Sequence, residues 1–179
     1  MTYLKPNTNE LYLTNIQKIL FTDETLMRLL VYPPRGWDEI KQIEILDPLN
    51  PLLPNIVDDS YEYWQIVEDK VRFGSKRMQI ENIKSAVLYM FEGTERPYFG
   101  NPYLSKKQVV FKIVVNEEFE VDKRISRISD RISHLIMRTS EVAGYGIIVQ
   151  VGKNSRESPL GNRLQEDIYE YTVMTKANG

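Results

Sequence analysis

Apolar and polar positions alternate with a helical period in the segment VDKRISRISDRISHLI, residues 121–136. Its apolar residues are spaced four, three, four and three positions apart, as on one face of a helix: Val121, Ile125, Ile128, Ile132 and Leu135. A second stripe beside it is basic: Arg124, Arg127, Arg131, His134 and Arg138. The pattern predicts an amphipathic helix that buries one face and carries a surplus arginine stripe.

Two consecutive helices are predicted near the N-terminus, where leucine and isoleucine again recur at helical spacing. Thr22 or Asp23 is in position to cap the second of them, and Pro33 and Pro34 end it because proline cannot continue a helix. A shared apolar face is formed by Leu13, Ile16, Ile19, Leu20, Leu26, Leu29 and Leu30.

The proline-leucine segment, residues 46–57, contains three prolines and is therefore expected to be extended rather than helical. It is also rich in apolar residues: Leu46, Leu49, Leu52, Leu53, Ile56 and Val57. Each of these would gain roughly 1.5–3 kcal/mol on full burial, which is too much to leave in water. We predict an arm that packs on a neighbouring subunit or ring and not on its own core.

Strand patterns fill most of the second half of the chain. IKSAVLYMFEGTERP and KQVVFKIVVNEEF are rich in β-forming residues, with Val109, Phe111 and Ile113 on one side, and GTERPYFGNPYLSKK between them suits a long hairpin tip. GYGIIVQVG and DIYEYTVMT supply two later strands. DSYEYWQIVEDKVRFG, residues 59–74, fits either a short amphipathic helix or a strand.

These elements predict an α+β fold, with a mostly antiparallel β-sheet flanked by an N-terminal helix and a central helix. The length of 179 residues suits a single domain. We place its core at about residues 12–34 and 85–175, and an inserted arm or loop at about 35–84.

Composition narrows the class of protein. The chain is 42% hydrophobic, and its formal charge of −2 argues against a dedicated nucleic-acid binder. The absence of cysteine excludes disulfides and thiolate metal sites. No run approaches the ~20 apolar residues that span a bilayer, and the first residues do not resemble a signal peptide. We therefore expect no membrane association, and a protein that works or is assembled in a cytosol.

Candidate catalytic groups are few. His134, the only histidine, lies inside the arginine stripe without a relay partner, and the Asp58–Asp59 pair has no companion histidine. The acids of residues 117–122 lack the glycine and the alternation of a calcium loop, and they suit a helix N-terminus better. We expect no catalytic residue, no metal and no cofactor, and therefore not an enzyme.

The arginine stripe has two interpretations. It is either a solvated face held by local ion pairs, such as Asp130 with Arg127 or Arg131, or a subunit interface that meets an acidic segment of a neighbouring copy. Residues 58–69 and 117–122 are acidic enough to receive it, and a head-to-tail contact of this kind closes into rings. We favour the interface. The loop aromatics lie among acids that would repel phosphates, so they too are better suited to protein contacts than to nucleic acid.

The order of elements resembles the neck proteins of tailed bacteriophages, above all the tail terminator family. The resemblance rests on the helices in IQKILFTDETLMRLLVYPP, the strands AVLYMFEG and QVVFKIVVNEEF, the helix VDKRISRISDRISHLI and the closing strand DIYEYTVMT. It covers residues 12–175 as a pattern. The piece from Arg35 to Lys84 departs from the compact family pattern and leaves the position within the neck open.

The resemblance implies a structural protein that forms a homo-oligomeric ring, commonly six-fold, in the neck of the virion. Such a ring ends the tail tube and joins it to the head-side connector protein, and DNA passes through its channel without specific binding. Assembly would take place in the cytoplasm of the bacterial host. The alternatives are a head-completion or adaptor protein of the same neck and, from another class, a small nucleic-acid-binding or regulatory α/β module.

Overall fold

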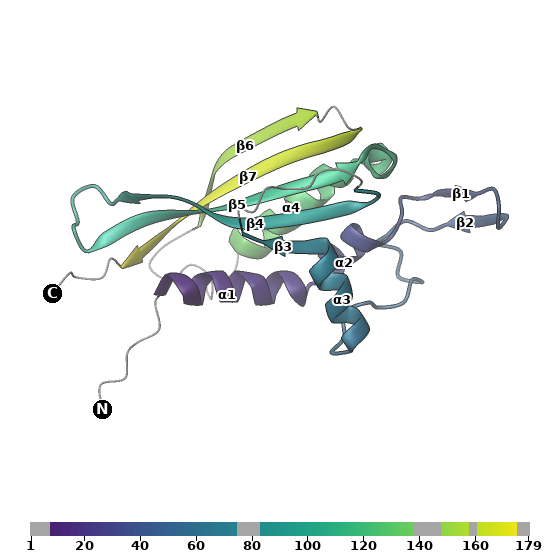
Figure 1. The fold of residues 1–179 in the computed structure, drawn as a ribbon, viewed down its shortest axis with the longest axis horizontal. Helices are drawn as coiled ribbons and strands as arrows, with labels where there is room; N and C mark the ends of the chain where they lie inside the picture. Colours follow the sequence, from purple (N-terminus) through teal and green to yellow (C-terminus); the bar gives the residue numbers. More distant parts are fainter. Residues whose placement is uncertain (1–7, 75–82, 138–147, 158–160, 175–179) are drawn as a thin grey trace.

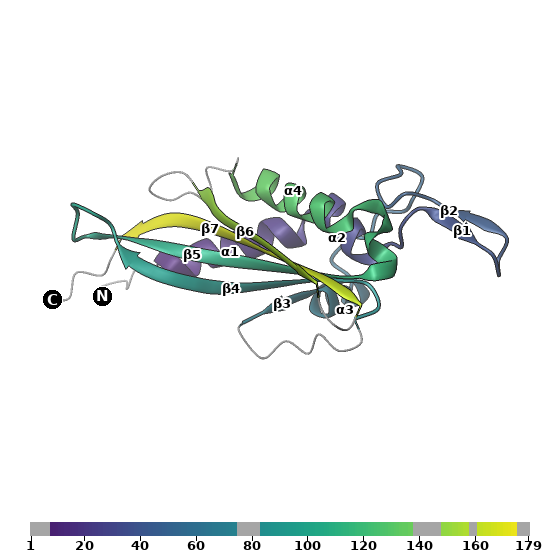
Figure 2. The same ribbon diagram turned by 90° about the horizontal axis from the view of Figure 1, so that it is seen from above.

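The computed structural model describes residues 8–74, 83–137, 148–157 and 161–174. Five strands form one twisted sheet, and the helices α1 (Thr8–Phe21), α2 (Glu24–Val31) and α4 (Arg124–Met137) lie against one of its faces (Figures 1 and 2). A separate two-stranded sheet extends from the end of the body near α2. The predicted α+β class is confirmed.

The large sheet has the strand order β3-β4-β5-β7-β6. Its strands are β3 (Val71–Phe73), β4 (Ala86–Pro97), β5 (Leu104–Asn116), β6 (Val149–Glu157) and β7 (Asn162–Met174). Every neighbouring pair is antiparallel except β3 and β4, which are parallel. The predicted mostly antiparallel sheet is therefore present, with the short strand β3 added at one edge and β6 at the other.

The main core lies between this sheet and the three helices. On β5 the alternate residues Val109, Phe111, Ile113 and Val115 are completely buried, because a strand turns every second side chain to the same face. Tyr169 of β7 packs edge-to-face on Phe111, with 5.7 Å between ring centroids. The side of β5 predicted to face the core is confirmed.

The two N-terminal helices form where their apolar spacing predicts them. Ile16 and Leu20 of α1 are fully buried, as are Leu26 and Leu30 of α2. Asp23 is the cap, since its carboxylate accepts a hydrogen bond from the amide of Leu26 at 2.7 Å. Helix α2 then ends at Val31, just before the two prolines.

The central helix begins later than its apolar pattern suggested. Residues Glu117–Asp122 form a 3-10 helix, Lys123 takes a left-handed conformation with φ of 59°, and α4 starts at Arg124. Val121 is therefore 73% exposed and is not part of the buried face. The face that packs on the core consists of Ile125, Ile128, Ile132 and Ile136, with Leu135 partly buried.

Residues 59–74 contain both of the structures that their sequence allowed. Helix α3 (Tyr61–Lys70) is capped by Ser60, whose hydroxyl accepts a hydrogen bond from the amide of Tyr63 at 3.1 Å. The chain then passes directly into β3. Earlier in the same predicted insertion, β1 (Gly36–Asp38) and β2 (Ile43–Ile45) pair with each other as a short antiparallel hairpin.

The hairpin of β4 and β5 is long and bends near its middle. Its register shifts between Glu92 and Glu95, and Gly93 lies at this irregularity. A Cβ atom on Gly93 would lie 2.8 Å from Cβ of Gln108, so only glycine fits this close approach. The predicted hairpin tip is confirmed, and it extends from the end of the molecule opposite to β1 and β2 (Figure 1).

Candidate assembly surfaces

The first residue of the arginine stripe, Arg124, lies in the interior of the molecule. Its side chain is fully buried, and its guanidinium donates hydrogen bonds to the carbonyl oxygens of Leu29 at 2.6 Å and Tyr32 at 2.8 Å. The carboxylate of Asp122 pairs with it at 2.9 Å. Arg124 thus holds the last turn of α2 against the start of α4. The prediction that it belongs to a subunit interface is wrong, because its charge and its donors are used inside the chain.

The next two arginines of the stripe also have partners within the chain. Arg127 pairs with Asp47 at 2.7 Å and with Asp122 at 2.9 Å, and Arg131 pairs with Asp23 at 2.5 Å. The hydrogen bond from Arg127 holds the pKa of Asp47 below its usual value. The hydrogen bond to Asp23 raises the pKa of the Arg131 guanidinium. Both arginines are partly exposed, and their predicted role in a subunit interface stays a prediction.

The carboxylate partners of the stripe come from the cap of α2, from the proline-leucine segment and from Asp122 in the 3-10 helix that precedes α4. The local ion pairs of Asp130 with Arg127 or Arg131 do not form. His134 is exposed on the last turns of α4. Arg138 lies outside the described residues, so its predicted interface role stays a prediction.

Arg28 of α2 fastens the proline-leucine segment to the body. Its guanidinium donates hydrogen bonds to the carbonyl oxygens of Asn50 at 2.9 Å, Leu53 at 2.9 Å and Pro54 at 3.2 Å, and to the side chain of Asn55 at 3.0 Å. A segment with three prolines cannot satisfy its carbonyl groups in regular structure, and a planar guanidinium supplies several donors in one place.

Glu24 holds the end of the same segment. Its carboxylate accepts hydrogen bonds from the amides of Ile56 at 3.1 Å and Val57 at 2.9 Å, and it pairs with Arg28. Burial opposes ionisation of Glu24, but the hydrogen bonds from Arg28 and from these amides outweigh it and lower the pKa. Ile56 and Val57 also pack on the main core. The prediction that the arm packs on a partner and not on its own chain is therefore wrong for these two residues.

The leucines of the segment differ in exposure. Leu52 is 81% exposed and Leu49 is 40% exposed, whereas Leu46 and Leu53 are partly buried. A contact of Leu49 and Leu52 with a partner stays a prediction. It would be made by the outer side of a segment that the body already holds, and not by a free arm.

The projecting arm of this chain is instead the hairpin of β1 and β2, ten residues upstream of the predicted one. Figure 1 shows it beyond the end of the body. Trp37, Ile40 and Ile43 on it are 57%, 95% and 52% exposed. Asp38 closes its turn by accepting hydrogen bonds from the amides of Ile40 and Lys41. A lone two-stranded hairpin is marginally stable in water, so large apolar side chains on it favour a contact with another protein.

The tip of the β4–β5 hairpin displays a second group of apolar side chains. Phe99 is fully exposed, and Tyr98 and Tyr103 are exposed beside it. The turn is nevertheless well ordered: Tyr98 donates its amide to Leu104 at 3.0 Å, and Gly100 supplies a positive φ of 81°. A rigid turn that presents aromatic rings loses little entropy on binding.

The groups that could carry chemistry are scattered. In the part of the chain that the structure describes, no three or more His, Asp or Glu side chains are grouped so that they could hold a metal ion. Asp58 accepts a hydrogen bond from the amide of Ser60 at 2.8 Å, within the turn that precedes α3. A pocket of about 330 Å³ lies between the start of α4 and the strands β6 and β7, and it is lined by residues of both charges.

Among the described residues, no helix is long and apolar enough to cross a membrane. No protein-family model matches the chain, and no curated protein matches its sequence.

Proposed function

We propose that this protein is a structural subunit of a tailed-bacteriophage neck, which assembles with copies of itself into a ring. The ring, six-fold in the family that the sequence resembles, would end the tail tube, join it to the head-side connector and leave a channel for DNA. Its place would be the neck of the virion, after assembly in the cytoplasm of the host.

The observation that carries this proposal is the pair of projecting hairpins at opposite ends of an elongated body (Figure 1). One presents Trp37, Ile40 and Ile43, and the other presents Tyr98, Phe99 and Tyr103. Exposed groups of large apolar side chains mark protein contacts, and contacts at two opposite ends allow one subunit to engage two neighbours. The net charge of −2 also suits a channel through which DNA slides without sticking.

Light scattering after gel filtration, together with negative-stain images, tests the proposal. We expect rings from the purified protein, or from the protein mixed with its tail tube or connector partner. A chain that remains monomeric under all of these conditions would contradict the proposal. Binding of DNA to the purified protein, measured by fluorescence anisotropy, would favour the nucleic-acid-binding alternative instead.

The proposal includes no catalytic step. Incubation with DNA and magnesium or manganese is therefore expected to leave the DNA intact. Cleavage that disappears in an Asp58→Ala, Asp59→Ala double variant would show that this carboxylate pair is catalytic.

A further inference from the structure

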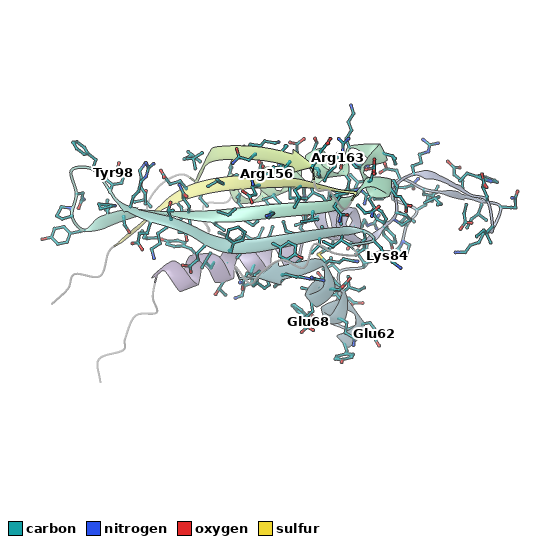
Figure 3. All side chains as sticks on the ribbon, turned by 45° about the horizontal axis from the view of Figure 1, so that its top comes forward. Glu62, Glu68, Lys84, Tyr98, Arg156 and Arg163 are labelled. Carbon is teal, nitrogen blue, oxygen red and sulfur yellow. The ribbon has the colours of Figure 1, made fainter. Side chains whose placement is uncertain are left out.

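The two edges of the five-stranded sheet differ in their balance of charge: at the β3 edge the acids of α3 outnumber Lys70 and Arg72, whereas at the β6 edge three basic residues outnumber Glu157. Strand β3 forms one edge and is continuous with helix α3, whereas β6 forms the other edge, four strands away. Figure 3 shows Glu62 and Glu68 on α3, across the sheet from Arg156 and Arg163 on β6 and β7. What each edge can bind depends on its charged side chains and on whether these side chains already have partners in the same chain.

The acidic edge consists of Asp59, Glu62 and Glu68, all exposed. Among the described residues, none of these three carboxylates forms an ion pair. Beside them lie exposed aromatic rings of α3 and β3: Tyr61, Trp64 and Phe73. Trp64 and Phe73 each pack edge-to-face on Phe21, with centroid distances of 5.8 and 5.6 Å, so these rings are held in place while part of their surface faces water.

The basic edge consists of Lys153, Arg156 and Arg163. All three are exposed. Lys153 donates a hydrogen bond to the hydroxyl of Ser129 at 3.1 Å, whereas the side chain of Arg156 forms no ion pair or hydrogen bond with another residue that the structure describes. Arg163 approaches only Glu157, at 3.9 Å, and that carboxylate is 84% exposed. Val149 and Val151 of β6 are also exposed. The 330 Å³ pocket opens here, with Arg156 and Arg163 among its lining residues.

We propose that the acidic edge of one copy of this chain binds the basic edge of the next copy. The inference rests on the proposed ring and adds to the two hairpins a subunit contact between the sheet edges. The carboxylates of Glu62 and Glu68 face the guanidinium groups of Arg156 and Arg163 across this contact. The aromatic side chains of the acidic edge cover Val149, Val151 and the pocket.

Charge and apolar surface both favour a second copy as the partner. Two edges of the same charge repel each other and two edges of opposite charge attract, so the contact is head-to-tail. Repeated head-to-tail contacts close into a ring. Among the described residues, the side chain of Arg156 has no partner and Arg163 has only a distant, exposed one, Glu157 at 3.9 Å, whereas Arg127 and Arg131 of α4 have close partners in their own chain. A contact between exposed charges also weakens with added salt, because screening shortens their range.

Charge reversal at each edge tests the proposal with the whole chain. Variant A carries Glu62→Lys and Glu68→Lys, and variant B carries Arg156→Glu and Arg163→Glu. Each variant has like charges on both edges, so we expect the dissociation constant for self-association to rise about 10- to 100-fold in sedimentation velocity. An equimolar mixture of A and B restores opposite charges at every contact and should assemble as the parent does.

A matched control reverses an exposed charge elsewhere. Lys18→Glu on α1 should leave association unchanged, and unchanged thermal unfolding shows that A and B are folded. The proposal is overturned if A and B assemble like the parent, or if their mixture does not recover. It is also overturned if the parent remains monomeric alone at every salt concentration. In that last case the ring proposal survives if rings appear with a tail or connector partner.

Discussion

The basic face of α4 and the basic edge at β6 have the same charge but different environments. On α4, Arg124 is buried and bonded to two carbonyl oxygens, and Arg127 and Arg131 each pair with a carboxylate brought from a distant part of the chain. On β6, Arg156 extends into solvent. The helical periodicity of the sequence identifies the arginines of α4 as a stripe, but it gives no signal for the basic residues at the β6 edge. A basic stripe in a sequence therefore indicates a partner but does not say whether that partner belongs to the same molecule.

The largest expected difference between the two regions is in stability. We predict that Arg124→Met lowers the free energy of unfolding by about 3–5 kcal/mol, because it leaves the carbonyl oxygens of Leu29 and Tyr32 without this donor and removes one of the two arginine partners of Asp122. Arg156→Met, the same change at an exposed position, should alter it by about 0.5 kcal/mol or less. Urea denaturation followed by circular dichroism measures both. Equal losses in the two variants would contradict the distinction between these arginines.

Arg28, which holds the proline-leucine segment, can be compared in the same way with an exposed arginine. Its replacement by Met removes the donors to three carbonyl oxygens, and we predict a loss of about 2–3 kcal/mol in the free energy of unfolding. Limited proteolysis near the exposed Leu52 should also become faster. Arg35→Met is the matched control, since Arg35 is exposed and pairs only with Glu44. If both variants are cleaved at the parental rate, Arg28 is not what holds the segment.

The smallest expected effect concerns pH and the pair of Arg127 with Asp47. The hydrogen bond from Arg127 lowers the pKa of Asp47 in the folded state, so the pair stabilises the fold above the unfolded pKa of about 3.9. This contribution disappears as the pH falls through the lower folded pKa. Because the pair is partly exposed, Asp47→Asn should cost only about 0.5–1 kcal/mol at neutral pH.

Unfolding curves at a series of pH values check this prediction. The difference between the parent and Asp47→Asn should be largest near neutrality and should shrink on acidification. Asp59→Asn, at an exposed carboxylate away from α4, should cost less at neutral pH. A difference for Asp47→Asn that grows toward low pH would mean that the pKa of Asp47 is raised, and not lowered, in the folded chain.

Regular periodicity was enough to predict much of the fold. The helices at the N-terminus, the long β4–β5 hairpin, the central helix and β7 all have apolar residues at intervals that match their geometry. The hairpin of β1 and β2 was missed because each strand has only three residues, too few for alternation to be visible. Trp37, Ile43 and the turn-forming Asp38 were its only signals.

The candidate surfaces were harder to predict because they depend on contacts between distant residues. Asp23, the partner of Arg131, is 108 positions away, and Asp47, one of the two partners of Arg127, is 80 positions away, so no local pattern could reveal these two contacts. The charged edges depend on strand order, which places β3 and β6 at opposite ends of the sheet. The acidic character of residues 58–69 was visible in the sequence, whereas the basic residues that complement it were not recognised.

The positions of the two tryptophans provide a built-in spectroscopic reporter. The chain contains only Trp37, on the β1–β2 hairpin, and Trp64, on the acidic edge, and both rings are about half exposed. Indole emission shifts to shorter wavelength when water leaves the ring, so a Trp37→Phe chain would report the acidic edge alone and a Trp64→Phe chain the hairpin alone. The order in which these two signals change during association would show which surface engages first, without any attached dye.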